Sequence, residues 1–175
     1  MVPASRAEAL ELLRGIAAPA RLIRHVELVG EAADELLAGL TKLRVPVDAT
    51  FVRVGVVVHD AGKVLHPAEL DGPGAAHEPA GEQLLLERGA SADVARVCRS
   101  HAQWRELPAS FDELVVALAD KLWKGARVRE LEERVINAAA EAVGRGRWDV
   151  FTELDGLFEE VAAAGQDRLE RSRAG

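Results

Sequence analysis

The chain of 175 residues contains no tyrosine, one cysteine and few aromatic residues. Without tyrosine, no phenol can act as a catalytic acid or as a nucleophile. The single cysteine, Cys98, cannot form an intramolecular disulfide, which is typical of proteins from a reducing compartment. Long apolar runs are also lacking: the longest one, from Val54 to Val58, is far too short to span a bilayer.

Positive charge is scarce as well. The formal net charge is −7 and the isoelectric point is about 5.3, whereas a nucleic-acid polymer needs a basic surface that displaces its counterions. The sequence therefore argues against a nucleic-acid partner, but it allows a small anionic substrate in a locally positive pocket. The N-terminal segment MVPASRAEALELLRG carries acids and no apolar core, so we expect no signal peptide, no membrane partner and a cytoplasmic location.

Apolar residues recur at helical spacing over most of the chain. Steps of three and four over residues 21–40 predict an amphipathic helix with His25 on its apolar face. Ser91 is placed to cap a helix, and Ser110 with Glu113 forms the capping box of another. We expect further helices, after the one at 21–40, at about residues 80–89, 91–102, 110–124, 127–143 and 148–163.

Three other segments are read differently. Residues 48–60, DATFVRVGVVVHD, have the β-branched composition of a buried strand, but no partner strand is evident and the neighbouring segments are helical. Proline and glycine predict a loop over residues 61–79, and the terminal RLERSRAG is expected to be frayed. Since no repeat or linker interrupts the chain, we expect one domain over residues 1–175.

Imidazole and carboxylate side chains occupy positions where they are costly unless they are paired, hydrogen-bonded or bound to metal. A mixed set of nitrogen and oxygen donors suits Mn, Fe, Co or Zn and is typical of hydrolytic or oxidative metal sites. The candidate ligands are His25, His59, Asp60, His77, His101 and Asp120.

Each candidate has an ordinary structural alternative when it is taken alone. These alternatives are a satisfied core histidine for His25, a helix end for His59 and Asp60, a surface position for His66 and His77, a helix cap for His101 and an ion pair with Lys124 for Asp120. They leave the ordered series His, His-Asp, His, His, Asp to coincidence.

That series resembles the HD-domain superfamily of metal-dependent phosphohydrolases over about residues 20–127. The matching segments are RHVELV around His25, VVVHDAGK with His59 and Asp60, HEPAGEQLL from His77, SHAQW around His101 and ALADKL around Asp120. The resemblance implies an all-α helical bundle of the HD type, in which residues 48–60 form a buried helix. The helices at about 127–163 would complete the bundle or form the interface of a homodimer, with a buried face made of Trp148, Phe151, Leu154, Leu157 and Phe158.

The resemblance also implies the roles of the ligands. His25, His59, Asp60 and Asp120 would bind one divalent metal, and His77 and His101 would hold a second one that Asp60 bridges. One or two ions per chain are expected, of Mn, Fe, Co or Zn, with Mg possible. HDAGK followed by HEPAG is similar to the cyclic-di-nucleotide phosphodiesterases of the HD-GYP branch, but a chain without tyrosine cannot carry the GYP motif.

The expected function is hydrolysis of a phosphate ester or anhydride in a nucleotide or another small metabolite. Asp60 and Lys63 are the candidate catalytic residues. The candidate substrate-binding residues are Lys63, Lys121, Lys124 and Arg127. A di-iron oxygenase on the same scaffold is the alternative, and a non-catalytic nucleotide-binding module is a third reading that the intact ligand set disfavours. Glu78 is interpreted as a surface carboxylate that could orient a ligand, and His66 matches no ligand position.

Overall fold

Helices account for the regular structure of residues 2–174, which are the residues that the computed structural model describes, and no strand occurs among them. The expected all-α architecture is confirmed. In chain order the elements are α1 (Arg6–Gly15), α2 (Ala20–Lys42), α3 (Ala49–Val58), the 3-10 turns η1 (Ala61–Val64) and η2 (Pro67–Leu70), α4 (His77–Glu87), α5 (Ala92–Ser100), α6 (Phe111–Leu122), α7 (Arg129–Val143), α8 (Arg147–Ala163) and α9 (Gly165–Arg173).

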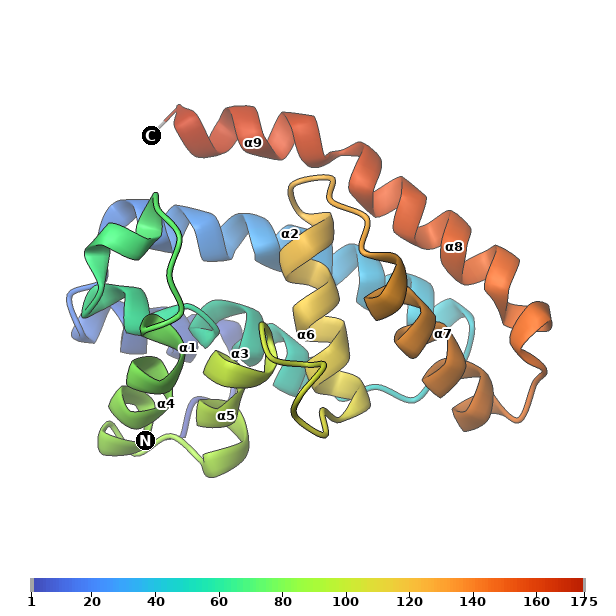
Figure 1. Cartoon of the computed structure of the whole chain (residues 1–175), viewed down its shortest axis with the longest axis horizontal. Helices are drawn as coiled ribbons and strands as arrows, with labels where there is room; N and C mark the ends of the chain where they lie inside the picture. Colours follow the sequence, from blue (N-terminus) through green and yellow to red (C-terminus); the bar gives the residue numbers. More distant parts are fainter. Residues whose placement is uncertain (1, 175) are drawn as a thin grey trace.

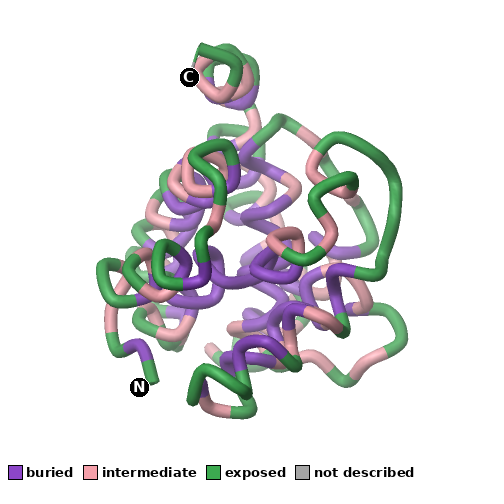
Figure 2. Tube along the Cα trace, turned by 90° about the vertical axis from the view of Figure 1, so that its left-hand side faces the viewer, coloured by how far each residue is buried: buried purple, intermediate pink, exposed green. Residues whose placement is uncertain are grey.

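Helix α2 packs against four other helices, α3, α6, α8 and α9. It runs along the long axis, α6 stands across it, and α8 and α9 lie along one side of it (Figure 1). One apolar cluster joins α2, α6, α7 and α8, and a smaller one joins α1, α3, α4 and α5. The buried segments meet in the interior of the helical bundle (Figure 2).

Residues 49–58 form a helix. The resemblance predicted this helix, whereas the composition of the segment did not decide between helix and strand. The Asp48 side chain accepts a hydrogen bond from the backbone N–H of Phe51 at 2.9 Å, which fixes the start of α3. The valines from Val54 to Val58 are buried. Gly55 allows α3 to approach α6 closely, since a Cβ there would lie 2.8 Å from a methyl carbon of Val116. Packing on several sides therefore outweighs the strand propensity of the β-branched run.

The expected helix starts at Ser91 and Ser110 are confirmed: the two hydroxyl oxygens accept hydrogen bonds from the backbone N–H groups of Val94 and Glu113, and the capping box at Ser110 is complete. The loop expected over residues 61–79 is wrong in part. It contains η1 and η2, and α4 begins at His77, three residues earlier than expected. A helix start is hard to see here because Ala76, at the N-cap, offers no side-chain acceptor.

The prediction of a frayed C-terminal tail is also wrong. Residues 165–173 form α9, whose Arg168 is buried and donates hydrogen bonds to the carbonyl of Val161 at 2.8 Å and to Glu35 at 2.5 Å. On α8, Leu154 and Phe158 are buried as expected, but Trp148 is 72% exposed and lies outside the core. Within residues 2–174, none of the helices combines the length and apolar character needed to cross a membrane.

Candidate metal centre

Side chains from five helical segments converge where α3 ends. His25 comes from the first half of α2, while His59 and Asp60 follow the last residue of α3. His77 opens α4, and His101 follows α5. Asp120 lies in the last turn of α6. Four of these residues are almost fully enclosed: the exposed fractions are 1% for His59, 3% for Asp60, 6% for His77 and 4% for His101.

The Asp60 carboxylate lies between two halves of this cluster. Its Oδ2 is 3.2 Å from Nε2 of His25 and 3.5 Å from Nε2 of His59. Its Oδ1 is 3.3 Å from Nε2 of His77 and 3.7 Å from Nε2 of His101. Each oxygen therefore faces a different pair of imidazoles, which is the arrangement expected of a bridging ligand.

The Asp120 carboxylate completes the half that contains His25. Its Oδ1 is 3.3 Å from Nε2 of His59 and 3.9 Å from Nε2 of His25. The ligand atoms of His25, His59 and Asp120 all lie within 4.8 Å of one another, and so do those of His59, Asp60 and His101. Five of the six predicted ligands thus form two overlapping groups that share His59, and His77 meets them through Asp60.

The orientation of the imidazole rings fits a metal. Nδ1 of His59 lies 2.9 Å from the carbonyl oxygen of Val56, and Nδ1 of His101 lies 3.1 Å from that of Val97. Because a carbonyl only accepts, each Nδ1 must carry a proton, so that Nε2 is the ring atom that faces the centre and is available to a metal. Nε2 of His25 and of His59 is buried without a hydrogen-bond partner in the described part of the chain. Buried polar atoms are rarely left in this state, so the residues present fit a divalent cation.

The electrostatics of the cluster also favour a cation. Burial acts to raise the pKa of Asp60, but the neighbouring imidazoles of His59, His25 and His77 hold it well below its usual range. Burial likewise opposes ionisation of Asp120, but the adjacent imidazole of His59 and the ammonium of Lys121 lower its pKa. Burial and the neighbouring charge of His59 lower the pKa of His101 to about 4. Two ionised carboxylates and a neutral imidazole are the protonation states that metal binding requires.

Two lysines lie at the edge of the cluster that is open to solvent. Nζ of Lys63 is 2.7 Å from Oδ2 of Asp60, and Nζ of Lys121 is 3.0 Å from Oδ2 of Asp120. The side chains of Lys63 and Lys121 are 18% and 26% exposed, and that of His25 is 22% exposed. These three side chains are therefore the parts of the cluster that are most exposed to solvent.

The other predicted substrate-binding residues are placed differently. Lys124 is exposed beyond the end of α6. Arg127 donates hydrogen bonds to Glu132 at 2.7 Å and to Asp155 at 2.6 Å, so its guanidinium is held between α7 and α8. His66 is half-buried at the start of η2. The structure thus brings Lys63 and Lys121 to the ligands and ties Arg127 to other partners.

Two acidic residues near His77 make contacts that the sequence did not indicate. Glu78 is buried rather than on the surface, and its Oε2 accepts a hydrogen bond from Nε2 of Gln103 at 2.5 Å. The expectation of a surface carboxylate is therefore wrong. Glu69 was not singled out, yet its Oε2 lies 2.5 Å from Nδ1 of His77. A glutamate eight residues before a ligand, inside a Pro/Gly segment, gives no local signal.

The glycines of HDAGK and HEPAG have a packing role. A Cβ on Gly62 would lie 1.9 Å from the carbonyl oxygen of His77, and one on Gly81 would lie 2.8 Å from the backbone nitrogen of Gly62. The backbones of η1 and α4 therefore touch directly, which places Asp60 beside His77. Cys98 packs against the same contact and donates its S–H to the carbonyl of Val58 at 3.2 Å; burial raises its pKa.

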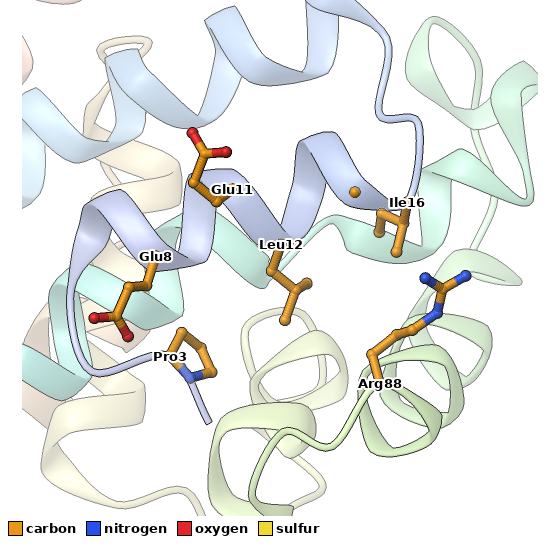
Figure 3. A pocket seen from close by; sticks show the side chains of 7 residues that line it. Pro3, Glu8, Glu11, Leu12, Ile16 and Arg88 are labelled. Carbon is orange, nitrogen blue, oxygen red and sulfur yellow. The ribbon is translucent and has the colours of Figure 1, made fainter. Parts of the chain in front are cut away.

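Two hollows lie away from these ligands. One, of about 290 Å³, is lined mainly by α1 and Arg88, with Leu12 and Ile16 projecting towards it (Figure 3). The other, of about 420 Å³, lies over α7 and α8 beside Trp148. Neither hollow is lined by a predicted metal ligand.

Comparison with known protein families matches residues 22–142 to the HD domain. Comparisons with curated proteins and with solved structures gave no match. The matched region runs from α2, three residues before His25, into the last turn of α7, and it includes all six candidate ligands. Domains of this family bind divalent metals and are associated with metal-dependent hydrolysis. Because the match covers more than half of its length, the chain belongs to the HD-domain family.

Proposed function

We propose that the chain hydrolyses a phosphate ester or anhydride of a nucleotide or another small phosphorylated metabolite. The observation that supports this most directly is the position of Asp60 between two pairs of imidazoles, with the Lys63 ammonium 2.7 Å from one of its oxygens. The carboxylate and imidazole groups are suitable ligands for divalent metals, and the partly exposed Lys63 ammonium beside them is suited to bind a phosphate group.

The ligands divide into two sets around Asp60. His25, His59 and Asp120 would hold one divalent cation, His77 and His101 would hold a second one, and Asp60 would be shared between them. A divalent transition metal bound here supplies Lewis acidity, which lowers the pKa of water and offsets the charge of the phosphate. Mn, Fe, Co and Zn all suit this donor set.

The chain's own residues would retain the cations and bind the phosphate group. Asp60 and Asp120 stay ionised and keep the site negative enough to retain cations. Lys63 presents a partly exposed ammonium at the open edge and is placed to donate to a phosphate oxygen as negative charge develops there. Lys121 adds a second ammonium beside Asp120 on the same side. The backbone contact at Gly62 fixes η1, which carries Lys63, against α4.

The overall charge supports a small substrate. A net charge of −7 disfavours a nucleic-acid polymer, whereas two lysines at one edge are enough to attract one or two phosphate groups. We therefore propose nucleotides and phosphorylated metabolites as the substrate class.

The test is a screen of nucleotides and generic phosphate esters, with Mn, Fe, Co or Zn added one at a time, run both without oxygen and in air. The expected result is release of phosphate that depends on the metal. Lys63→Ala should lower kcat/KM about a hundredfold, Lys63→Arg should lose less, and Lys42→Ala, at the far end of α2, should match the wild type. Turnover that requires both iron and oxygen would instead support the di-iron oxygenase alternative and refute hydrolysis.

A further inference from the structure

One carboxylate makes three contacts at the start of α4. Oε2 of Glu69 lies 2.5 Å from Nδ1 of His77 and accepts the backbone N–H of His77 at 3.0 Å. Its Oε1 accepts the backbone N–H of Ala76 at 3.2 Å. Glu69 therefore supplies the N-terminal cap that the alanine at the N-cap cannot provide, and it binds the imidazole at the same time.

The bond to Nδ1 has a chemical consequence. An ionised carboxylate only accepts hydrogen bonds, so Nδ1 of His77 must carry the proton. Nε2 is then the ring atom that faces Oδ1 of Asp60, 3.3 Å away, and it is the atom available to a metal. Backbone carbonyls do the same for His59 and His101, but the partner of His77 is a side chain on a separate element, and a substitution can remove it.

The surroundings of Glu69 hold it in this position. Its side chain is 12% exposed. Gly74 lies directly against it with a φ of +156°, and a Cβ there would be 2.4 Å from Oε1 of Glu69. An ion pair between Arg21 and Asp71 attaches the same segment to α2. The chain from Pro67 to Ala76 thus wraps around the carboxylate and is anchored to a helix that carries another ligand.

We propose that Glu69 is the positioning residue of His77: it fixes the Nδ1–H tautomer and the ring orientation, so that the half of the centre facing Oδ1 of Asp60 depends on the segment from Pro67 to Ala76. Metal binding by His77 rests on the proposed function, but its tautomer does not. A carboxylate behind a histidine ligand raises the affinity of such a ligand for metal by about 10- to 100-fold.

The experiment measures which ring nitrogen of His77 carries the proton in the full-length protein, by ¹⁵N–¹H correlation NMR of the imidazole rings, after treatment with a chelator and at an alkaline pH at which the imidazole is neutral. The wild type is expected to show the Nδ1–H form. Glu69→Ala should shift His77 towards the Nε2–H form that free histidine prefers, and Glu69→Gln should keep part of the Nδ1–H form because its amide oxygen can still accept. Ser110→Ala, which removes a helix cap at α6, is the matched control and should leave His77 unchanged.

Titration with Co²⁺, followed by its visible absorption, provides the second measurement. Two equivalents should bind to the wild type, and in Glu69→Ala the weaker one should bind about 10- to 100-fold less tightly. If the His77 tautomer is the same in Glu69→Ala as in the wild type, the proposal is overturned. If the tautomer shifts but no Co²⁺ binds to any form, the positioning role stands and the proposed function fails.

Discussion

Replacing Gly62 by alanine is a direct test of how the centre is built. The new Cβ would lie 1.9 Å from the carbonyl oxygen of His77 and 2.6 Å from the backbone nitrogen of Gly81, whereas ordinary contacts begin at 3.4 Å. Both obstructing atoms belong to the backbone of α4, so no side-chain rotation can relieve the overlap. Helix α4 or η1 must move by about 1.5 Å, and the His77 side chain moves away from Asp60 with it.

The free energy of unfolding should fall by about 3 kcal/mol, the upper part of the usual range for an overpacked interior. That is a large share of the total stability of a domain of this size. Equilibrium unfolding in urea measures the change in the protein treated with a chelator, so that lost packing is separated from lost metal.

Gly156→Ala is the matched control. Gly156 lies within α8, and a Cβ there would meet nothing within 4 Å. Alanine at that position should stabilise the protein by up to about 1 kcal/mol, because glycine is the poorer helix former. If Gly62→Ala unfolded within about 0.5 kcal/mol of the wild type, the backbone contact between η1 and α4 would not have the role assigned to it.

Three further predictions concern separate parts of the molecule. His25→Ala should remove the metal held with Asp120 and His77→Ala should spare it, as measured by elemental analysis; identical metal content in the two variants would contradict a centre in two halves. Arg168→Met should lower the free energy of unfolding in urea by about 2 kcal/mol, because buried carbonyls lose their donor. An unchanged free energy of unfolding would contradict this role of Arg168. Burial acts to raise the pKa of Asp34, but hydrogen bonds from two arginines lower it below its ordinary value. The carboxylate therefore stabilises the fold above a pH of about 4 and loses this effect as the pH falls through its folded-state pKa, so Asp34→Asn should be less stable than the wild type at neutral pH in urea unfolding and nearly equal to it in strong acid.

The helical architecture could be predicted because apolar periodicity and capping residues act locally. The spacing around His25 and the capping box at Ser110 each depend on residues within one or two turns, and the structure has both. The series of ligands was visible because the family resemblance supplied the order of residues, and the structure brings all six together.

The features that the sequence did not predict depend on distant partners. Glu69 caps α4 across a loop of prolines and glycines, a contact that no periodic pattern encodes. Arg168 is buried because Glu35, 133 residues earlier, lies opposite it, whereas its own segment is polar enough to suggest a solvated tail. Trp148 has the hydrophobicity of a core residue, but at the start of α8 it is 72% exposed.

The burial of Cys98 gives the protein an internal reporter. It is the only thiol in the sequence, and its Sγ is enclosed between the end of α3, α4 and α5, with a raised pKa that leaves almost no reactive thiolate. A thiol-specific reagent can reach it only after these three helices separate, and they carry or immediately precede His59, His77 and His101. The rate of labelling therefore measures how often the metal centre opens, and it does so in the unmodified chain. A cation that binds the closed form should slow that rate in proportion to its occupancy, so a simple colorimetric time course can rank metals without knowledge of the substrate.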